Sequence, residues 1–155
     1  MIDEKSVTCS FSGHRILPIK FNREELRKAV YNAINDGFYR FLIGMAIGFD
    51  TVCFEELIKI REEKNIKIIA CVPCKDQAEY YNRSQKRVYQ SLLKKADEVI
   101  ILAEKYYEGC MQKRNEFMVD NSSRLICYLK TCYGGTYSTV KYAAESNIEI
   151  VYLDR

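Results

Sequence analysis

Short apolar runs alternate along the chain with longer amphipathic segments, and this alternation restricts the fold more than any other property. The runs expected to form strands are residues 7–12, 38–43, 67–72, 98–102, 124–129 and 149–153. Runs such as VIIL (99–102) and LICYL (125–129) are continuously apolar, which is typical of strands buried on both faces of a parallel sheet. The sequence therefore predicts an α/β fold: a Rossmann-like, doubly wound, mostly parallel sheet of about six strands with helices on both faces.

The segments between these runs show the periodicity of amphipathic helices. Asn22 is a suitable N-cap for the first helix, with Glu25 in the capping-box position, and Gly37 is the expected left-handed residue after its end. We expect Asp50 to cap the second helix and Asp76 to open the third. The predicted helices are residues 23–36, 50–64, 76–92, 109–121 and 136–146.

The length of 155 residues fits one domain, residues 1–155, with one core. No apolar run approaches the roughly 20 residues of a membrane span, and the first residues do not resemble a signal peptide. We therefore expect a cytoplasmic protein that does not associate with membranes. In that compartment the seven cysteines should be free thiols, with Cys9, Cys71 and Cys127 buried in strands.

Six of the seven glycines follow predicted strands, and all such segments emerge at the carboxyl edge of a parallel sheet. These glycines are Gly13, Gly44, Gly48, Gly109, Gly134 and Gly135. Ligands of doubly wound sheets bind at this edge, where the winding reverses. Glycine lets the backbone approach a ligand, and the adjoining helix N-termini favour phosphate. The pattern predicts a site for a phosphate-bearing small molecule, although glycines also make tight turns.

Three loops are candidates for the phosphate site: SGHR (12–15), GMAIGFD (44–50) and GGT (134–136). The third most resembles a phosphate cradle, because two glycines and a hydroxyl stand at a helix start. None of the loops matches the P-loop pattern or the dinucleotide G-x-G-x-x-G pattern.

These loops, together with ACVPC (70–74) and YYEGCMQKRNEFMVD (106–120), resemble the YpsA-like family, a branch of the SLOG superfamily named after the Smf/DprA and lonely-guy proteins. The resemblance implies a Rossmann-like fold and a nucleotide or nucleotide-derived ligand such as an ADP-ribose-like molecule, bound by a sensor or binding module. The ligand-binding residues would be Gly13, His14, Arg15, Gly44, Met45, Ala46, Gly48, Asp50, Arg114, Asn115, Gly134, Gly135 and Thr136.

Two alternative functions stay open. The lonely-guy enzymes release a base from its ribose phosphate and carry PGGxGT followed by a nearby Glu; here the loop lacks the Pro and the extra Gly, and Glu145 is far along the helix. A nucleotide N-glycosidase is one alternative, although the missing Glu counts against it and no catalytic residue is assigned. The other is DprA-like binding of single-stranded nucleic acid, which the net charge of +3, mixed with acidic residues along the helices, neither supports nor excludes.

Several residues have both a functional and a structural interpretation. His14 could donate to phosphate or act as an acid/base, or it could simply bond the backbone. Arg114 could clamp phosphate or lie on a solvated helix face. Either Tyr106 or Tyr107 could stack on a base or serve packing.

The C-x-x-C motif of Cys71 and Cys74 begins inside a strand, which does not favour a redox role. With one histidine and no second C-x-x-C pair, no metal site is expected. The expected partner is a nucleotide-like small molecule, and an exposed apolar helix face would also allow a homo-oligomer.

Overall fold

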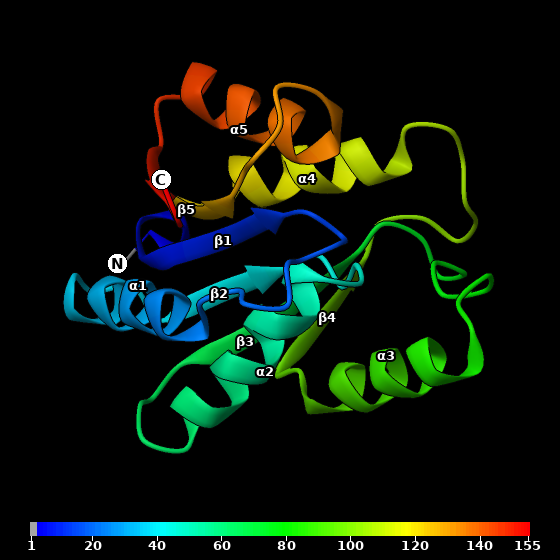
Figure 1. Ribbon diagram of the computed structural model, residues 1–155, viewed down its shortest axis with the longest axis horizontal. Coiled ribbons are helices and arrows are strands. Elements are labelled where there is room, and N and C mark those ends of the chain that lie inside the picture. Colours follow the sequence, from blue (N-terminus) through cyan, green and yellow to red (C-terminus); the bar gives the residue numbers. More distant parts are fainter. Residues whose placement is uncertain (1–2) are drawn as a thin grey trace.

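The computed structural model describes residues 3–155, which contain a six-stranded sheet in which every strand pairing is parallel. Its strands are β1 (Thr8–Gly13), β2 (Arg40–Ile43), β3 (Lys67–Val72), β4 (Glu98–Ile101), β5 (Arg124–Tyr128) and β6 (Glu149–Tyr152). Their order across the sheet is β4-β3-β2-β1-β5-β6. The chain builds outward from β1 to β4 and then returns to place β5 on the other side of β1, so the winding reverses beside β1 (Figure 1).

Helices cover both faces of this sheet (Figure 1). They are α1 (Arg23–Asn35), α2 (Phe49–Arg61), α3 (Arg83–Lys95), α4 (Cys110–Asp120) and α5 (Gly134–Glu145), and a short 3₁₀ helix, η1 (Glu4–Val7), precedes β1. α1, α2 and the inner side of α3 pack on one face, whereas α4 and α5 pack on the other. The predicted Rossmann-like α/β fold is thus confirmed, with a sheet that is entirely parallel.

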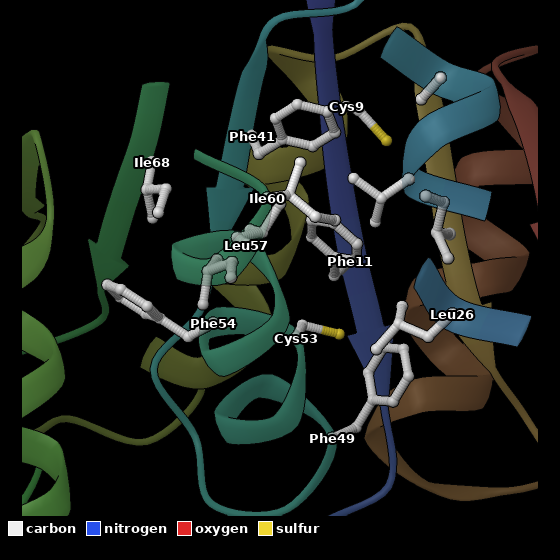
Figure 2. Packing of buried hydrophobic residues seen from close by; sticks show 14 of the residues in the cluster. Cys9, Phe11, Leu26, Phe41, Phe49, Cys53, Phe54, Leu57, Ile60 and Ile68 are labelled. Carbon is white, nitrogen blue, oxygen red and sulfur yellow. The ribbon is translucent and has the colours of Figure 1, made fainter. Parts of the chain in front are cut away.

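The larger hydrophobic core lies between the sheet and α1 and α2, and Figure 2 shows its packing. Phe49, the first residue of α2, is fully buried there and stacks against Tyr128 at the end of β5. Phe21 meets both rings edge to face. This aromatic cluster fixes the start of α2 against the carboxyl ends of β1 and β5, where the predicted site lies.

Helix starts are only partly as predicted. The Asn22 side chain does cap α1 by accepting from the Glu25 amide (3.1 Å), but the Glu25 carboxylate accepts from the Asp154 amide instead of closing a capping box. The third helix does not open at Asp76. α3 begins after Asn82, which forms a capping box with Gln85, because this pair satisfies the first helical amides reciprocally.

The two apolar runs that suggested a buried parallel sheet have different environments. Residues 124–128, in β5, are buried throughout. β4 is an edge strand, and Val99, Ile101 and Leu102 are exposed, with Ile101 at 47%. The prediction that residues 99–102 are buried on both faces is therefore wrong: β4 is the last strand at one edge of the sheet formed by the described residues, so its side chains have fewer neighbours than those of a central strand.

Candidate functional site

A cavity of about 290 Å³ lies at the carboxyl edge of the sheet, beside the strand at which the winding reverses. The segments that follow β1, β2 and β5 and the first turns of α4 form its walls. Eleven of the thirteen predicted residues line it: Gly13, His14, Arg15, Gly44, Ala46, Asp50, Arg114, Asn115, Gly134, Gly135 and Thr136. Met45 and Gly48 line a neighbouring cavity instead. We call the first cavity the anion cavity.

Three of the glycines are required by contacts within the protein. A methyl group added at Gly13 would lie 2.3 Å from the Phe49 ring, and one added at Gly48 would lie 2.2 Å from the carbonyl oxygen of Arg15. One added at Gly44 would lie 2.8 Å from the guanidinium carbon of Arg114. These glycines let the loops after β1 and β2 and the side chain of Arg114 pack against one another, so their role is to close the loops together.

Gly134 and Gly135 have a different environment, because a methyl group added at either would have no atom of residues 3–155 within 4 Å apart from those of the adjoining residues and of the helix's own backbone. They form the first turn of α5, with Thr136 next, and no side chain in the described part of the chain caps this helix. α2 and α4 also begin without a side-chain cap, whereas asparagines cap α1 and α3. The first amides of a helix have no intrahelical partner, so those of α5 are available to a ligand in the cavity.

Arg114 is a buried cation in the wall of this cavity, with 4% of its surface exposed. Its Nη1 donates to the carbonyls of Gly44 and Cys71, the latter at 3.3 Å, and its Nε donates to Asn115 Oδ1 at 2.8 Å. These bonds leave Nη2 available to a ligand. The alternative of a solvated helix face is therefore wrong, since α4 turns this side chain inward under the loop after β2.

Asp50 supplies the carboxylate that lines the anion cavity. Its Oδ2 accepts from the amide of Ala46 at 3.1 Å, inside the same loop, and the N-cap of α2 is Gly48 rather than Asp50 as predicted. Burial raises the pKa of Asp50, and the positive charge of Arg114 opposes that rise. Burial likewise lowers the pKa of Arg114, and the charge of Asp50 opposes that fall. Each group thus reduces the electrostatic cost of burying the other.

His14 holds two of the loops together. Its Nε2 accepts from the amide of Lys130 at 2.8 Å, across the gap between the loops after β1 and β5, and its ring meets Tyr128 edge to face. Burial lowers the pKa of His14, so the neutral ring is favoured, with its proton on Nδ1. The bond to the backbone agrees with the structural interpretation, and the Nδ1–H remains as a donor.

This bond makes a pH effect on stability testable. Because the folded-state pKa of His14 lies below the unfolded value, its contribution is fully present above about pH 6.5 and is lost as the pH falls toward the folded pKa. His14→Gln keeps an acceptor but does not titrate. Urea unfolding at several pH values between 5 and 8 should show the wild type losing stability relative to His14→Gln as the pH falls. Parallel pH profiles for the two proteins would contradict this expectation.

Several predicted features lie outside the anion cavity. Tyr106 and Tyr107 are exposed and line neither this cavity nor its neighbour. Cys71 and Cys74 are buried, and burial raises the pKa of each thiol to about 12, which keeps both protonated and inert. Cys132, between β5 and α5, is exposed, whereas the other six cysteines are buried.

Sequence reasoning missed other residues in the wall of the cavity. These are Phe11, Met111, Thr131 and Tyr133, whereas Ser12, also in the wall, belongs to the predicted loop of residues 12–15. Each of them is close in sequence to a predicted loop or helix residue, and this closeness could have indicated that it lines the cavity. Within residues 3–155, no group of three or more His, Cys, Asp or Glu residues could hold a metal ion, and no helix has the length and apolarity needed to cross a membrane.

The charge of α3 differs from the expected mixture of acidic and basic residues. The helix carries five basic residues and no acidic one: Arg83, Lys86, Arg87, Lys94 and Lys95. Because α3 begins after Asn82, the acidic Asp76 and Glu79 fall outside it. α3 therefore presents a basic surface to solvent.

The all-parallel sheet and the glycine-lined edge define a Rossmann-like protein. Residues 12–153 match the YpsA family model, described as the YspA SLOG family, and the chain belongs to this family. It is 31% identical over 121 residues to an uncharacterized SPbeta prophage-derived protein, YoqJ, of Bacillus subtilis (strain 168), which covers 70% of this chain and 71% of that protein. A UPF0398 protein of Bacillus pumilus (strain SAFR-032) is 27% identical over 111 residues, with 70% of this chain and 60% of that protein covered.

Solved structures of DNA processing protein A (DprA) have a similar fold. The Streptococcus pneumoniae protein superposes with a TM-score of 0.70 at 17% identity, over 97% of this chain and 53% of that one. The Helicobacter pylori protein, studied for its single-stranded DNA binding mode, gives 0.68 at 18% identity, over 97% and 66%. At these identities the likeness concerns the fold, and this chain spans between half and two thirds of the DprA chains.

Proposed function

We propose that the anion cavity binds the phosphate of a nucleotide or nucleotide-derived small molecule, and that the protein acts as a binding or sensing module. One observation carries the proposal: a buried arginine, Arg114, shares a cavity with the uncapped N-terminus of α5. A buried cation and free helix amides both stabilise an anion.

The remaining polar groups suit the uncharged part of such a ligand. The Asp50 carboxylate and the Asn115 side chain can bond sugar hydroxyls, and the Nδ1–H of His14 can donate to an oxygen. A ribose phosphate offers hydroxyls and anionic oxygens side by side. This combination supports nucleotide-type ligands, including ADP-ribose-like molecules.

Gly135→Asp tests the role of α5 by placing a carboxylate where the phosphate is proposed to bind. The new side chain enters open space at the helix N-terminus, so we expect stability to be unchanged or to rise by about 0.3–1 kcal/mol. Affinity for nucleoside monophosphates should fall by about tenfold or more, since the carboxylate repels the phosphate. Thermal unfolding and isothermal titration calorimetry measure the two effects. Gly135→Asn, without the charge, is the control and should retain most of the affinity.

Binding of single-stranded nucleic acid is the second candidate function, favoured by the five basic residues of α3 and by the fold shared with DprA. Its affinity for an oligonucleotide would fall steeply between about 50 mM and about 200 mM salt. Charge reversal at Lys86 and Arg87, on the basic surface, would weaken that binding without affecting mononucleotides. Salt-insensitive binding that these changes leave intact would argue against the second candidate.

N-glycosidase activity is a separate alternative, and incubation of the protein with the same nucleoside monophosphates tests it. Asp50 is the acidic residue in the lining of the anion cavity, and Glu145 ends α5 about 16 Å from its first residue, by the helical rise. Our proposal expects binding without turnover. Release of free base from a nucleoside monophosphate, abolished by Asp50→Asn, would replace it with the hydrolase alternative.

A further inference from the structure

A second cavity, of about 370 Å³, adjoins the anion cavity and lies between α2, α3 and the loop that follows β2. Its size falls in the usual range for small-ligand sites. Its walls are mainly apolar, and we call it the apolar cavity. The aliphatic and thioether side chains in its wall are Leu17, Met45, Ile47, Val52, Val88 and Leu92.

The two cavities adjoin, because Ala46 and Asp50 line both. Tyr81 lines the apolar cavity; burial raises the pKa of its hydroxyl, and the charges of Arg15, Arg114 and Asp50 also act on it. The hydroxyl of Tyr81 therefore lies near the charged groups of the anion cavity.

The polar and charged side chains in the wall of the apolar cavity are Arg23, Asp50, Thr51, Glu55, Tyr81, Ser84, Gln85 and Tyr89. Gln77 does not line the cavity but bonds to two residues of its wall. The buried Gln77 amide donates from Nε2 to the carbonyl of Met45 (3.1 Å) and to the hydroxyl of Tyr81 (3.4 Å), which fixes its orientation. Its Oε1 has no hydrogen-bond partner among residues 3–155. The Tyr81 hydroxyl accepts from Gln77, so its own proton is free to donate. Tyr89 meets the Tyr81 ring edge to face, at 5.9 Å between centroids.

We propose that the apolar cavity binds the nucleobase of the same ligand whose phosphate binds in the anion cavity. A nucleobase has flat apolar faces and a polar edge, which match aliphatic walls such as Val52, Val88 and Leu92 and the polar group at Tyr81. This inference rests on the proposed function and adds to it a separate site for the base of the ligand.

The test fills the apolar cavity and leaves the anion cavity unchanged. Val88 lines the cavity from α3 and is 39% exposed, so Val88→Trp blocks the space without displacing the core. Ser84→Trp, at the start of α3, is a second blocking variant. Lys94→Trp is the matched control, because Lys94 is exposed on the same helix and lines neither cavity. Thermal unfolding confirms that each variant folds.

Calorimetry would compare ribose 5-phosphate, the four ribonucleosides and their monophosphates. We expect one monophosphate to bind wild type at least about tenfold more tightly than ribose 5-phosphate. Both blocking variants should remove that advantage and leave the affinity for ribose 5-phosphate within about twofold. Lys94→Trp should preserve both affinities.

The outcomes separate this inference from the proposed function. Equal affinities for ribose 5-phosphate and every monophosphate would overturn the inference and leave phosphate binding intact. Tight nucleotide binding that neither blocking variant weakens would also overturn it. Nucleoside binding that the blocking variants weaken, with no gain from the phosphate, would support the base site and overturn the phosphate site. If no compound binds, both proposals fail.

Discussion

Gly48→Ala is expected to destabilise the protein by about 2–5 kcal/mol, because two separate costs add at this position. The backbone of Gly48 has a φ of +83°, which an L side chain rarely adopts, and the new methyl group would lie 2.2 Å from the Arg15 carbonyl oxygen. Since that atom belongs to the backbone, relief requires the loop after β1 to move. Urea unfolding monitored by circular dichroism measures the loss.

Gly109→Ala is a control for a positive φ without the close contact. Gly109 has a φ of +90° and also begins a helix, and a methyl group added there would lie in open space. Its ψ of −2° places it in the left-handed helical region, so the substitution should cost about 1–2 kcal/mol. Gly48 has a ψ of −121°, outside that region, so its larger cost combines the dihedral angles with the close contact. If the two variants lose equal stability, neither the ψ of Gly48 nor the contact between the loops after β1 and β2 contributes to the loss.

Arg114→Met should reduce both stability and ligand affinity. The substitution removes the cation beside the buried Asp50 and the bonds to the carbonyls of Gly44 and Cys71, so we expect a loss of about 3–5 kcal/mol. Losing a charge-assisted contact to phosphate should weaken nucleoside monophosphate binding by roughly 10- to 100-fold. Chemical unfolding and calorimetry at pH 7 measure the two losses.

A double variant separates these two roles. Adding Asp50→Asn to Arg114→Met removes the carboxylate left without a counter-charge, so part of the stability should return. The affinity for phosphate should not return, because the cation is still missing. Recovery of binding in the double variant would show that Arg114 acts only as a structural partner of Asp50, which would contradict the proposed phosphate contact.

The fold could be predicted because its signal is local and repeated. Apolar runs and helical periodicity report which face of each element is buried, and β3 has the predicted bounds of residues 67–72. The exposure of β4 could not be predicted, because an edge strand and a central strand can carry the same residues. The start of α3 was misplaced because both Asp76 and Asn82 are suitable caps, and only the tertiary structure selects Asn82.

The sequence predicted which residues line the anion cavity better than it predicted what those residues do there. Parallel strands deliver their following loops to one edge, so position in sequence was sufficient to gather eleven residues. Their roles depend on distances between loops. Gly13 and Gly48 make room for Phe49 and Arg15, and Arg114 is buried because a glycine at position 44 leaves room for it. No local pattern contains that information.

The position of Cys132 offers a practical route to these measurements. Its thiol is exposed between Thr131 and Tyr133, two residues of the cavity wall, whereas the other six thiols are buried. A maleimide fluorophore should therefore attach at one place, at the mouth of the cavity, without any engineered cysteine. The unmodified protein can thus be labelled at Cys132. A reducing buffer will be needed during storage to prevent this thiol from forming disulfides between molecules.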